Sequence, residues 1–390
     1  MREQIGREVV IVEAARTPIG RGRRETGYYT DVHANELLGA CYSAVIERAG
    51  IAPELVEDVV AGCVTQAGEQ SQNIARNAWL QAGLPVTTPA TTVDRQCGSA
   101  QQAVNFAAAQ IAAGVHEVVI GAGVEHMGHV PMGANASHPQ ETGVPFPPEL
   151  MDRYELIAQG LSAELIAERW EIPRSELDEF GVRSQQLAAR ATDEGRFERE
   201  IVPMRVNGAT YVSDQGIRPE TNLETLATLR PAFKPDGRIT AATSSQISDG
   251  AAALLLMSRA KAEDLGLKPR ARIVDQVTAG VDPVIMLTGP IPATRMILER
   301  NQLAIGDIDL IEINEAFASV VLAWKRELQP DMDRVNVNGG ALALGHPLGS
   351  SGARLITTLL HELERSEKDL GLVTMCTAGG TGPATLIQRI

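Results

Sequence analysis

The sequence predicts an α/β protein built from two related halves. Apolar runs of strand length alternate with amphipathic helical stretches, which is typical of βα units around mixed sheets. The run VVIVEAARTP at residues 9–18 is echoed by ARIVDQVTAG at 271–280. In the same way, LVEDVVAGCV at 55–64 is echoed by DIDLIEINEA at 307–316. The internal repeat indicates that the core is duplicated.

In each half we expect a strand to lead through a reactive turn into a helix. In the first half, residues 90–93 are rich in β-formers, and small or apolar residues then recur at helical spacing from Ala100 to Ile111. Gly114 ends that helix, and Cys97 lies in the turn before it. In the second half the corresponding turn holds His346. Each half closes on a further β-rich run, AAALLLMS in the first and ATLIQRI in the second.

Cys97 at the amino end of a helix has two interpretations. Unpaired N–H groups and the helix dipole favour a thiolate there, which suits a nucleophile. Free cysteine is also among the most buried residue types, which suits a structural role. The position alone favours neither interpretation.

Between the halves, from about Val124 to Ser244, the composition changes. The segment opens with Gly, His and Pro and then turns into charged helices, as expected for a lid or a binding insert. It carries His126, His129 and His138, whose spacing matches no standard metal site and has no acidic cluster beside it in the sequence. We therefore predict a polar loop and no metal.

Length and composition place further limits. With 390 residues, 44% hydrophobic and 22% charged, the chain has core enough for two or three domains. Its net charge of −14 argues against general nucleic-acid binding, so an anionic ligand would require a local basic patch. The four cysteines are widely spaced, which argues against a disulfide framework or a zinc site and suits a reducing compartment. Cys41 and Cys63 sit in apolar runs and are predicted to fill the core.

Three further segments point to one dispersed catalytic site. They read NEAFA from Asn314, GHPLG around His346 and CTAGGTG from Cys376, each in a turn after a β-rich run. Together with VDRQCGSAQQA around Cys97, they make the chain resemble the thiolase family, whose members make and break 3-ketoacyl-CoA thioesters. The resemblance runs from VVIVEAARTPIGR through SSQISDGAAALLLMS to the closing cysteine hairpin, in the family's order.

The resemblance implies a thiolase fold, with two duplicated βαβαβαββ halves in a five-layered αβαβα arrangement and an inserted loop domain. We expect an amino-terminal half at residues 1–123, completed by 245–270, and a carboxy-terminal half at 271–390. Residues 124–244 would form the loop domain, which carries CoA binding and oligomer contacts.

The resemblance also assigns roles to the motifs. Cys97 would be the acylated nucleophile, with His346 as its base, aimed by the proline that follows it. His346 and a water held by Asn314 would stabilise the enolate of acetyl-CoA. Glu315 would be a structural or water-orienting partner. Cys376 would be the second acid/base, so that the two cysteines run opposite proton transfers in one cycle.

The oxyanion hole for the tetrahedral intermediates is expected from the N–H groups of Cys97 and Ala378. Thiolases usually carry glycine where this chain has Ala378. If that position requires a positive φ, alanine would be strained by about 1–3 kcal/mol. For CoA binding, the family contacts map onto Arg218, Thr225 and Ser245, of which Arg218 supplies a fixed cation.

The substrate class is predicted from two positions. Short-chain biosynthetic thiolases carry a His-Met pair where this chain has Ala158 and Gln159, and the loss of that pair makes room for a larger acyl group. We therefore expect a degradative acetyl-CoA C-acyltransferase acting on a medium or bulky 3-ketoacyl-CoA, similar to actinobacterial thiolases of steroid breakdown. The alternatives are a biosynthetic enzyme that makes acetoacetyl-CoA, a ketoacyl-synthase-like condensing enzyme, and an inactive acyl-CoA-binding relative.

The expected partners are CoA, as co-substrate, and acyl-CoA thioesters, with no permanently bound cofactor and no nucleic acid. The amino terminus lacks the apolar core of a signal peptide, and no stretch approaches eighteen uninterrupted apolar residues. We therefore expect no membrane association, a cytoplasmic location, and a homodimer or homotetramer.

Overall fold

The computed structural model describes residues 6–390 and contains one continuous ten-stranded mixed sheet and a small two-stranded sheet. The large sheet divides into two halves, which are called the first and the second sheet below. The first has the strand order β1-β8-β5-β3-β4. In chain order these strands are β1 (Val9–Arg16), β3 (Asp58–Gly62), β4 (Ala90–Val93), β5 (Val118–His126) and β8 (Ser248–Ser258). Strand β3 runs parallel to both of its neighbours, and β8 runs antiparallel to β1 and β5. The two-residue strand β2 (Gly20–Arg21) pairs antiparallel with the first residues of β8.

The second sheet has the order β9-β12-β11-β10. Its strands are β9 (Ala271–Gly280), β10 (Leu310–Ile313), β11 (Leu370–Thr374) and β12 (Thr381–Arg389). The two sheets join only where β1 meets β9, through the pairs Val10–Arg272 and Ile11–Ala271. The predicted repeat is confirmed, because the two VVIVEAARTP-like runs are β1 and β9 and the closing runs lie in β8 and β12.

One predicted element differs. No strand in the described part of the chain directly precedes the His346 turn as β4 precedes Cys97. The segment there makes a single bridge, between Ile311 and Val335, and then enters the short helix α12 (Ala341–Leu344). The glycines at 339, 340 and 345 suit this tight path, since Gly339 and Gly345 adopt positive φ.

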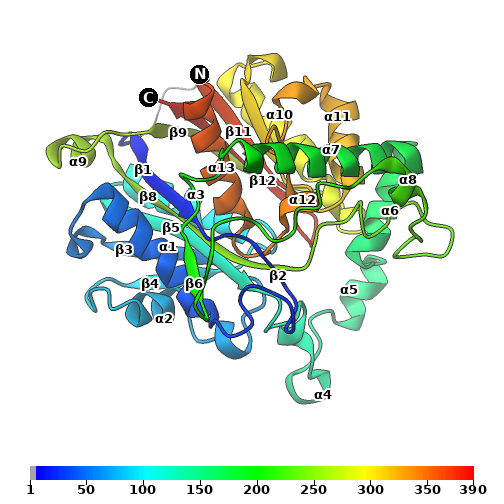
Figure 1. Cartoon of the computed structure of the whole chain (residues 1–390), viewed down its shortest axis with the longest axis horizontal. Helices are drawn as coiled ribbons and strands as arrows, with labels where there is room; N and C mark the ends of the chain where they lie inside the picture. Colours follow the sequence, from blue (N-terminus) through cyan, green and yellow to red (C-terminus); the bar gives the residue numbers. More distant parts are fainter. Residues whose placement is uncertain (1–5) are drawn as a thin grey trace.

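Helices and sheets alternate in five layers (Figure 1). The central layer is formed by α3 and α13, which contact each other and strands of both sheets. One outer layer, α1 and α2, covers the first sheet, and the other, α10 and α11, covers the second. These helices are α1 (Ala34–Ala49), α2 (Ile74–Gln81), α3 (Ser99–Ala112), α10 (Pro290–Asn301), α11 (Ala318–Leu328) and α13 (Ser351–Arg365). The predicted αβαβα arrangement is thus confirmed.

The alanines of α3 explain its place in the middle layer. Strand β5 is buried along its whole length, because both faces of its sheet are covered. A Cβ on Gly121 of β5 would lie 2.7 Å from the Cα of Val104 in α3, so only glycine admits the helix at this distance. Small side chains on both elements therefore bring the start of α3, and with it Cys97, down to the sheet.

The segment between β5 and β8 is long and mostly helical. It contains α4 (Pro139–Thr142), α5 (Pro148–Arg153), α6 (Gln159–Arg169), α7 (Arg174–Asp193), β6 (Met204–Val206), β7 (Ala209–Tyr211) and α8 (Leu223–Ala227). Strand β5 continues to His126, so the sheet extends three residues into the range assigned to the insert. The fully buried guanidinium of Arg16 fixes the insert to β1 through Glu200 at 2.5 Å and Asp214 at 2.7 Å.

Helix α9 (Arg259–Asp264) and six short 3-10 segments complete the described elements. The 3-10 segments are η1 (Pro53–Leu55), η2 (Gly68–Gln70), η3 (Ala134–Ala136), η4 (Met286–Thr288), η5 (Ile305–Asp307) and η6 (Met332–Arg334). Within residues 6–390 no helix combines the length and the apolar character needed to cross a bilayer.

Candidate active site

Cys97 lies in the turn between β4 and α3, as predicted. Its side chain is 3% exposed, and Gln96 before it takes a positive φ of 50°, a left-handed conformation uncommon for a residue with a side chain. The Ser99 hydroxyl accepts the Arg95 N–H at 2.9 Å and donates to the Gln96 carbonyl at 2.6 Å, which fixes the turn. Cys97 is therefore held in a fixed turn at the amino end of α3.

Burial opposes the effect of the helix terminus on Cys97. The sequence predicted that the helix terminus would favour a thiolate, but burial raises the pKa of Cys97 to about 12. Hydrogen bonds from the N–H groups of Ala378 and of Cys97 itself oppose this rise without overcoming it. Desolvation outweighs the helix terminus, so the resting group is a thiol that requires a base.

His346 lies in the turn before α13, beside the Cys97 turn. A Cβ on Gly349 would lie 2.8 Å from the Cα of Cys63, and one on Gly352 would lie 2.3 Å from the Gln101 backbone nitrogen. Gly349 lets the histidine turn approach the end of β3, and Gly352 lets the starts of α13 and α3 come to backbone contact. Cys97 and His346 are therefore delivered by the adjoining amino ends of two neighbouring helices.

The hydrogen bonds of His346 define its tautomer. Nδ1 lies 2.6 Å from the Ser351 hydroxyl, and that hydroxyl donates its own proton to the Pro347 carbonyl at 2.8 Å. The hydroxyl oxygen must then accept from Nδ1–H, which leaves a lone pair on Nε2. Asn314 Nδ2 donates to Nε2 at 3.2 Å. Burial, with a smaller contribution from Arg354, lowers the pKa of His346 to about 3, so the imidazole is neutral.

Asn314 and Cys376 reach the site from neighbouring parallel strands. Ile313 of β10 pairs with Thr374 of β11, so Asn314 and Cys376 follow one and two residues beyond that pair at the same sheet edge. Asn314 is fully buried, and its Oδ1 accepts no hydrogen bond within the described residues, which leaves that oxygen available to a water or a substrate.

Cys376 faces the Cys97 turn. A Cβ on Gly98 would lie 2.9 Å from the Thr377 side chain, which shows how closely the two turns pack. Burial is the main cause that raises the pKa of the Cys376 thiol, and the nearby Cys97 raises it further. Both cysteines are buried, and Cys97 is close enough to influence the ionisation of Cys376.

The backbone of Ala378 is unstrained, although thiolases usually have glycine at this position. The positive φ values of this turn fall on Gly379 and Gly380, at 77° and 76°, and Ala378 is not among the described residues with positive φ. Its N–H points at the Cys97 sulfur. Alanine is therefore accommodated without cost, and the N–H is available.

Glu315 and Glu125 are buried carboxylates that support the site from opposite sides. Glu315 accepts from the Ser184 hydroxyl at 2.6 Å, Asn336 Nδ2 at 2.9 Å and the Leu342 N–H at 3.2 Å, which ties the asparagine turn to α7 and α12. Glu125 accepts the N–H groups of Val64, Thr65 and Gly349 at 2.8–3.0 Å and so connects the end of β3 to the histidine turn.

A basic cavity of about 460 Å³ opens beside these turns. Arg218 and Ser245, two of the predicted CoA contacts, line it together with Arg21 and Arg23. Thr225, the third, is exposed at the start of α8 and is not among the lining residues. Partial burial, and repulsion by Arg21 and Arg23, lower the pKa of Arg218. Such repulsion between cations is relieved when an anion binds.

Backbone hydrogen bonds connect this cavity to the catalytic turns. The Ser245 N–H donates to the Ala316 carbonyl at 2.9 Å, beside Asn314. The His346 N–H donates to the Gln246 carbonyl at 3.3 Å and to the Ser248 hydroxyl at 3.2 Å. An anionic ligand held in the cavity would therefore have its other end directed toward His346.

Two of the three histidines singled out in the sequence form a separate cluster. The rings of His126 and His129 stack at 3.8 Å, and with Glu69 they place three potential ligand atoms within 4.8 Å of one another. Each Nε2 faces a backbone carbonyl, of Tyr29 or Thr30. An ion in the plane of one stacked ring would lie well out of the plane of the other, so the rings are not arranged to share one metal.

Comparison with known proteins identifies the family. The family model for the thiolase N-terminal domain matches residues 9–260, and that for the thiolase C-terminal domain matches residues 267–389. The chain belongs to the thiolase family. It is therefore an acyltransferase of the class that uses CoA as a co-substrate.

Full-length relatives of this thiolase share nearly half of its residues. It is 44% identical to the steroid 3-ketoacyl-CoA thiolase FadA6 of Mycobacterium tuberculosis, over 98% of this chain and 94% of the relative. It is 46% identical to the 3-ketoacyl-CoA thiolase of Aeromonas salmonicida, over 98% and 100%. The crystal structure of the Bacillus anthracis acetyl-CoA acetyltransferase aligns with a TM-score of 0.91 at 39% identity, covering 100% of both chains.

Several residues of this thiolase site were not predicted from sequence. Arg21 and Arg23 lie in the basic run RGRRET. In an acidic protein, this local cluster of positive charge could have indicated the anion-binding cavity. Ser351 and Glu125 gave no such signal, because their contacts join segments whose proximity depends on the fold.

Proposed function

We propose that the protein is a degradative 3-ketoacyl-CoA thiolase, which cleaves its substrate with CoA to acetyl-CoA and a shortened acyl-CoA through an acyl-Cys97 intermediate. The observation that carries the proposal is the meeting of two cysteine turns and an Asn314–His346 pair at one buried centre. The identity of 44–46% to 3-ketoacyl-CoA thiolases along the whole chain supports the degradative assignment.

In the first half-reaction, His346 Nε2 gives up its hydrogen bond from Asn314 Nδ2 and its lone pair takes the Cys97 proton, while the sulfur attacks C3 of the 3-ketoacyl thioester. With pKa values of about 12 for Cys97 and about 3 for His346, the ion pair does not form in the resting site. Proton transfer must therefore accompany carbon–sulfur bond formation. The oxyanion at C3 accepts hydrogen bonds from the backbone N–H groups of Cys97 and Ala378.

Collapse of that intermediate breaks the C2–C3 bond. The electron pair moves into the enolate of acetyl-CoA, whose oxygen accepts from the newly protonated His346 Nε2–H and from a water on Asn314. The Cys376 thiol then protonates C2, which leaves acetyl-CoA, acyl-Cys97 and a Cys376 thiolate. The C3 oxyanion and the enolate oxygen are thus each stabilised by hydrogen-bond donors of the site.

In the second half-reaction, the Cys376 thiolate takes the proton of incoming CoA, and the CoA sulfur attacks acyl-Cys97. Cys97 leaves as a thiolate, which forms the shortened acyl-CoA. The thiolate then recovers its proton from His346. Both cysteines end as thiols and the imidazole ends neutral, so protons balance over the cycle. Arg21, Arg23 and Arg218 would hold the phosphates of CoA.

For the acyl group, we infer a medium or bulky chain that passes Ala158 and Gln159 at the start of α6. The neighbouring Gly160 packs on Phe233, because a Cβ there would lie 2.0 Å from that ring. Phe233 in turn packs edge-to-face on Phe317, three residues after Asn314, with ring centroids 5.8 Å apart. Residues 158 and 159 therefore adjoin the asparagine turn.

A biosynthetic acetyl-CoA acetyltransferase is the second candidate, favoured by the structural match to the Bacillus anthracis enzyme of that name. For the remaining properties we propose a homodimer or homotetramer in the cytoplasm, with no permanently bound cofactor. We retain the division at residues 1–123 with 245–270, 124–244 and 271–390 as the proposed domain arrangement.

The test combines an activity assay with trapping. Thiolase activity predicts CoA-dependent loss of the absorbance of the Mg²⁺–enolate of a 3-ketoacyl-CoA. Brief incubation with an acyl-CoA, followed by quenching and peptide mass spectrometry, should place the acyl group on Cys97, and Cys97→Ala should remove both signals. An acyl group on Cys376 would overturn the roles, and absence of cleavage with every 3-ketoacyl-CoA would overturn the function.

A further inference from the structure

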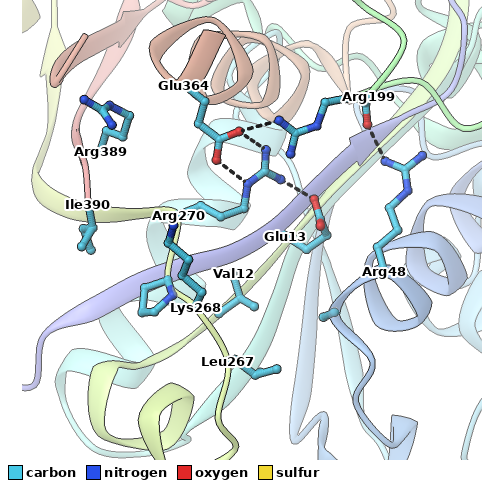
Figure 2. A pocket seen from close by; sticks show the side chains of 12 residues that line it. Val12, Glu13, Arg48, Arg199, Leu267, Lys268, Arg270, Glu364, Arg389 and Ile390 are labelled. Carbon is cyan, nitrogen blue, oxygen red and sulfur yellow. Dashed lines mark hydrogen bonds and ion pairs between the residues drawn. The ribbon is translucent and has the colours of Figure 1, made fainter. Parts of the chain in front are cut away.

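A second cavity of about 460 Å³ lies where the first and second sheets join, beside the carboxy-terminal residue Ile390 (Figure 2). Its lining comes from segments far apart in the sequence: the end of α1, the turn after α7, the segment before β9, the end of α13 and the end of β12. Five of its lining residues are cationic, namely Arg48, Arg199, Lys268, Arg270 and Arg389. Two are acidic, namely Glu13 and Glu364.

Helix α13 sets the distance between this cavity and the catalytic centre. Ser351, the first residue of α13, contacts His346, whereas Glu364 lines the cavity thirteen residues later. At 1.5 Å per residue, the two sites are about 20 Å apart along the helix. The cavity is therefore separate from the active site and from the basic cavity beside it.

The ion pairs around the cavity leave some positive charge uncompensated. Arg270 bridges Glu13 and Glu364, and Arg199 adds a contact to Glu364 at 3.4 Å (Figure 2). Arg389 pairs with Asp369 at 2.7 Å, outside the lining. These three arginines are thus matched by three carboxylates.

The other two cations have no carboxylate partner among the described residues. Arg48 donates to the backbone carbonyls of Arg199 at 2.8 Å and Ile201 at 3.0 Å, so its position is fixed while its charge is not neutralised. Lys268 is exposed and makes no ion pair or side-chain hydrogen bond within residues 6–390. The chain has a net charge of −14, so two cations without carboxylate partners at one cavity make a local site that favours an anion.

The wall of the cavity is fixed at Arg270 and Arg48, whereas Arg199 and Lys268 lie exposed at its rim. The Arg270 N–H donates to the Ile11 carbonyl at 2.9 Å, and the Ile390 N–H donates to the Arg270 carbonyl at 3.0 Å. Arg270 is only 10% exposed, so its guanidinium is preorganised by its two carboxylates. Fixed guanidinium groups around a concavity of small-molecule size are suited to phosphate oxygens.

We propose that this cavity is a second ligand site, which binds a small phosphate-bearing dianion. Arg48 and Lys268 supply the two uncompensated charges, and Arg199, which is 73% exposed, can turn from Glu364 toward the ligand. The concave shape favours a small anion over an acidic protein segment, which would require a more extended surface. The proposal does not rest on the thiolase reaction.

The probe is inorganic pyrophosphate, titrated calorimetrically into the wild-type protein at constant ionic strength. The test variant, Lys268→Gln with Arg199→Gln, removes two exposed cations at little structural cost. It should raise the dissociation constant for pyrophosphate at least tenfold. The control, Lys261→Gln with Arg205→Gln, removes the same charge from exposed or half-exposed positions outside the cavity and should change it less than twofold.

Arg218→Gln tests whether pyrophosphate instead occupies the other basic cavity. Binding should survive this change, and saturating CoA should not compete. The proposal fails if wild-type protein shows no millimolar binding, if the control weakens binding as much as the test variant, or if Arg218→Gln alone abolishes it. A hexaglutamate peptide that binds more tightly than pyrophosphate would assign the cavity to a protein partner and also overturn it.

Discussion

The Ser351 hydroxyl accepts a hydrogen bond from His346 Nδ1 at 2.6 Å and donates its own proton to the Pro347 carbonyl at 2.8 Å. This arrangement fixes the imidazole tautomer in the way that an aspartate does in a serine protease, but with a neutral partner. A neutral partner orients the ring without stabilising the imidazolium. It therefore agrees with an imidazole that stays neutral until substrate is attacked.

Ser351→Ala should lower kcat by about 10- to 100-fold, a part of the 10²–10⁴-fold that a general base contributes in total. Without the hydroxyl, the proton can move to Nε2 and the base is lost in a fraction of molecules. The matched control is Ser350→Ala, because Ser350 also contacts the Pro347 carbonyl, at 3.2 Å, without contacting the imidazole. The measurement is the steady-state kcat of the two variants and its pH profile. Equal losses in the two variants would reduce Ser351 to a structural role.

Cys376→Ser should cripple carbon–carbon bond cleavage by at least 100-fold while acylation of Cys97 by an acyl-CoA remains measurable. The reason is that acylation draws on His346, whereas protonation of C2 draws on the Cys376 thiol. Stopped-flow cleavage and mass spectrometry of the acylated peptide separate the two steps. If a folded variant loses the rates of cleavage and of acylation equally, the separate roles assigned to His346 and Cys376 are wrong.

Arg218→Gln should raise KM for CoA about tenfold, since hydrogen bonds to charged groups are worth about 1.5–3 kcal/mol. A truncated thiol that carries only the pantetheine arm should show an unchanged KM, because it lacks the phosphates. The comparison of the two thiols is the readout. An equal effect on both would place Arg218 at the acyl end rather than at the phosphates.

His361 predicts an acid sensitivity of the fold that is independent of catalysis. Burial, followed by repulsion from Arg270, lowers the pKa of His361 to about 3, against about 6.5 in an unfolded chain. Between these values only the unfolded state binds the proton. Stability is therefore intact above about pH 6.5 and is lost as the pH falls toward 3, by up to about 1.4 kcal/mol per pH unit.

His361→Gln keeps a donor for the Thr357 carbonyl, which His361 Nδ1 contacts at 2.9 Å, and removes the titration. Urea unfolding from pH 7 to pH 4.5 should show a shallower loss of stability in this variant than in the wild type. His138→Gln, at an exposed position, is the control and should follow the wild type. Parallel curves for all three proteins would contradict the assignment.

The duplicated core could be predicted from the sequence, because local patterns of strands and helices indicate it. The resemblance to thiolases singled out the turns at Cys97, Asn314, His346 and Cys376, and their catalytic roles stay predictions. The strand before Cys97 and the helix after it follow from β-rich residues and from spaced alanines. The extent to which burial raises the pKa of Cys97 could not be predicted, since the helix terminus is a local feature while burial depends on the packed fold. The Ser351–His346 contact could not be predicted, because it requires the path of the turn at residues 346–351 in three dimensions.

The last prediction concerns substrate size, argued from Ala158 and Gln159 at the start of α6. Each additional methylene buried by the substrate contributes about 0.8 kcal/mol, so a few carbons can shift kcat/KM by more than tenfold toward longer or branched chains. The measurement compares acetoacetyl-CoA with a medium-chain and a bulky cyclic 3-ketoacyl-CoA at equal CoA. The double variant Ala158→His with Gln159→Met should move the preference back toward acetoacetyl-CoA, whereas Glu168→Gln, at an exposed position of the same helix, should not. A clear preference of the wild type for acetoacetyl-CoA would reject the degradative assignment in favour of the biosynthetic one.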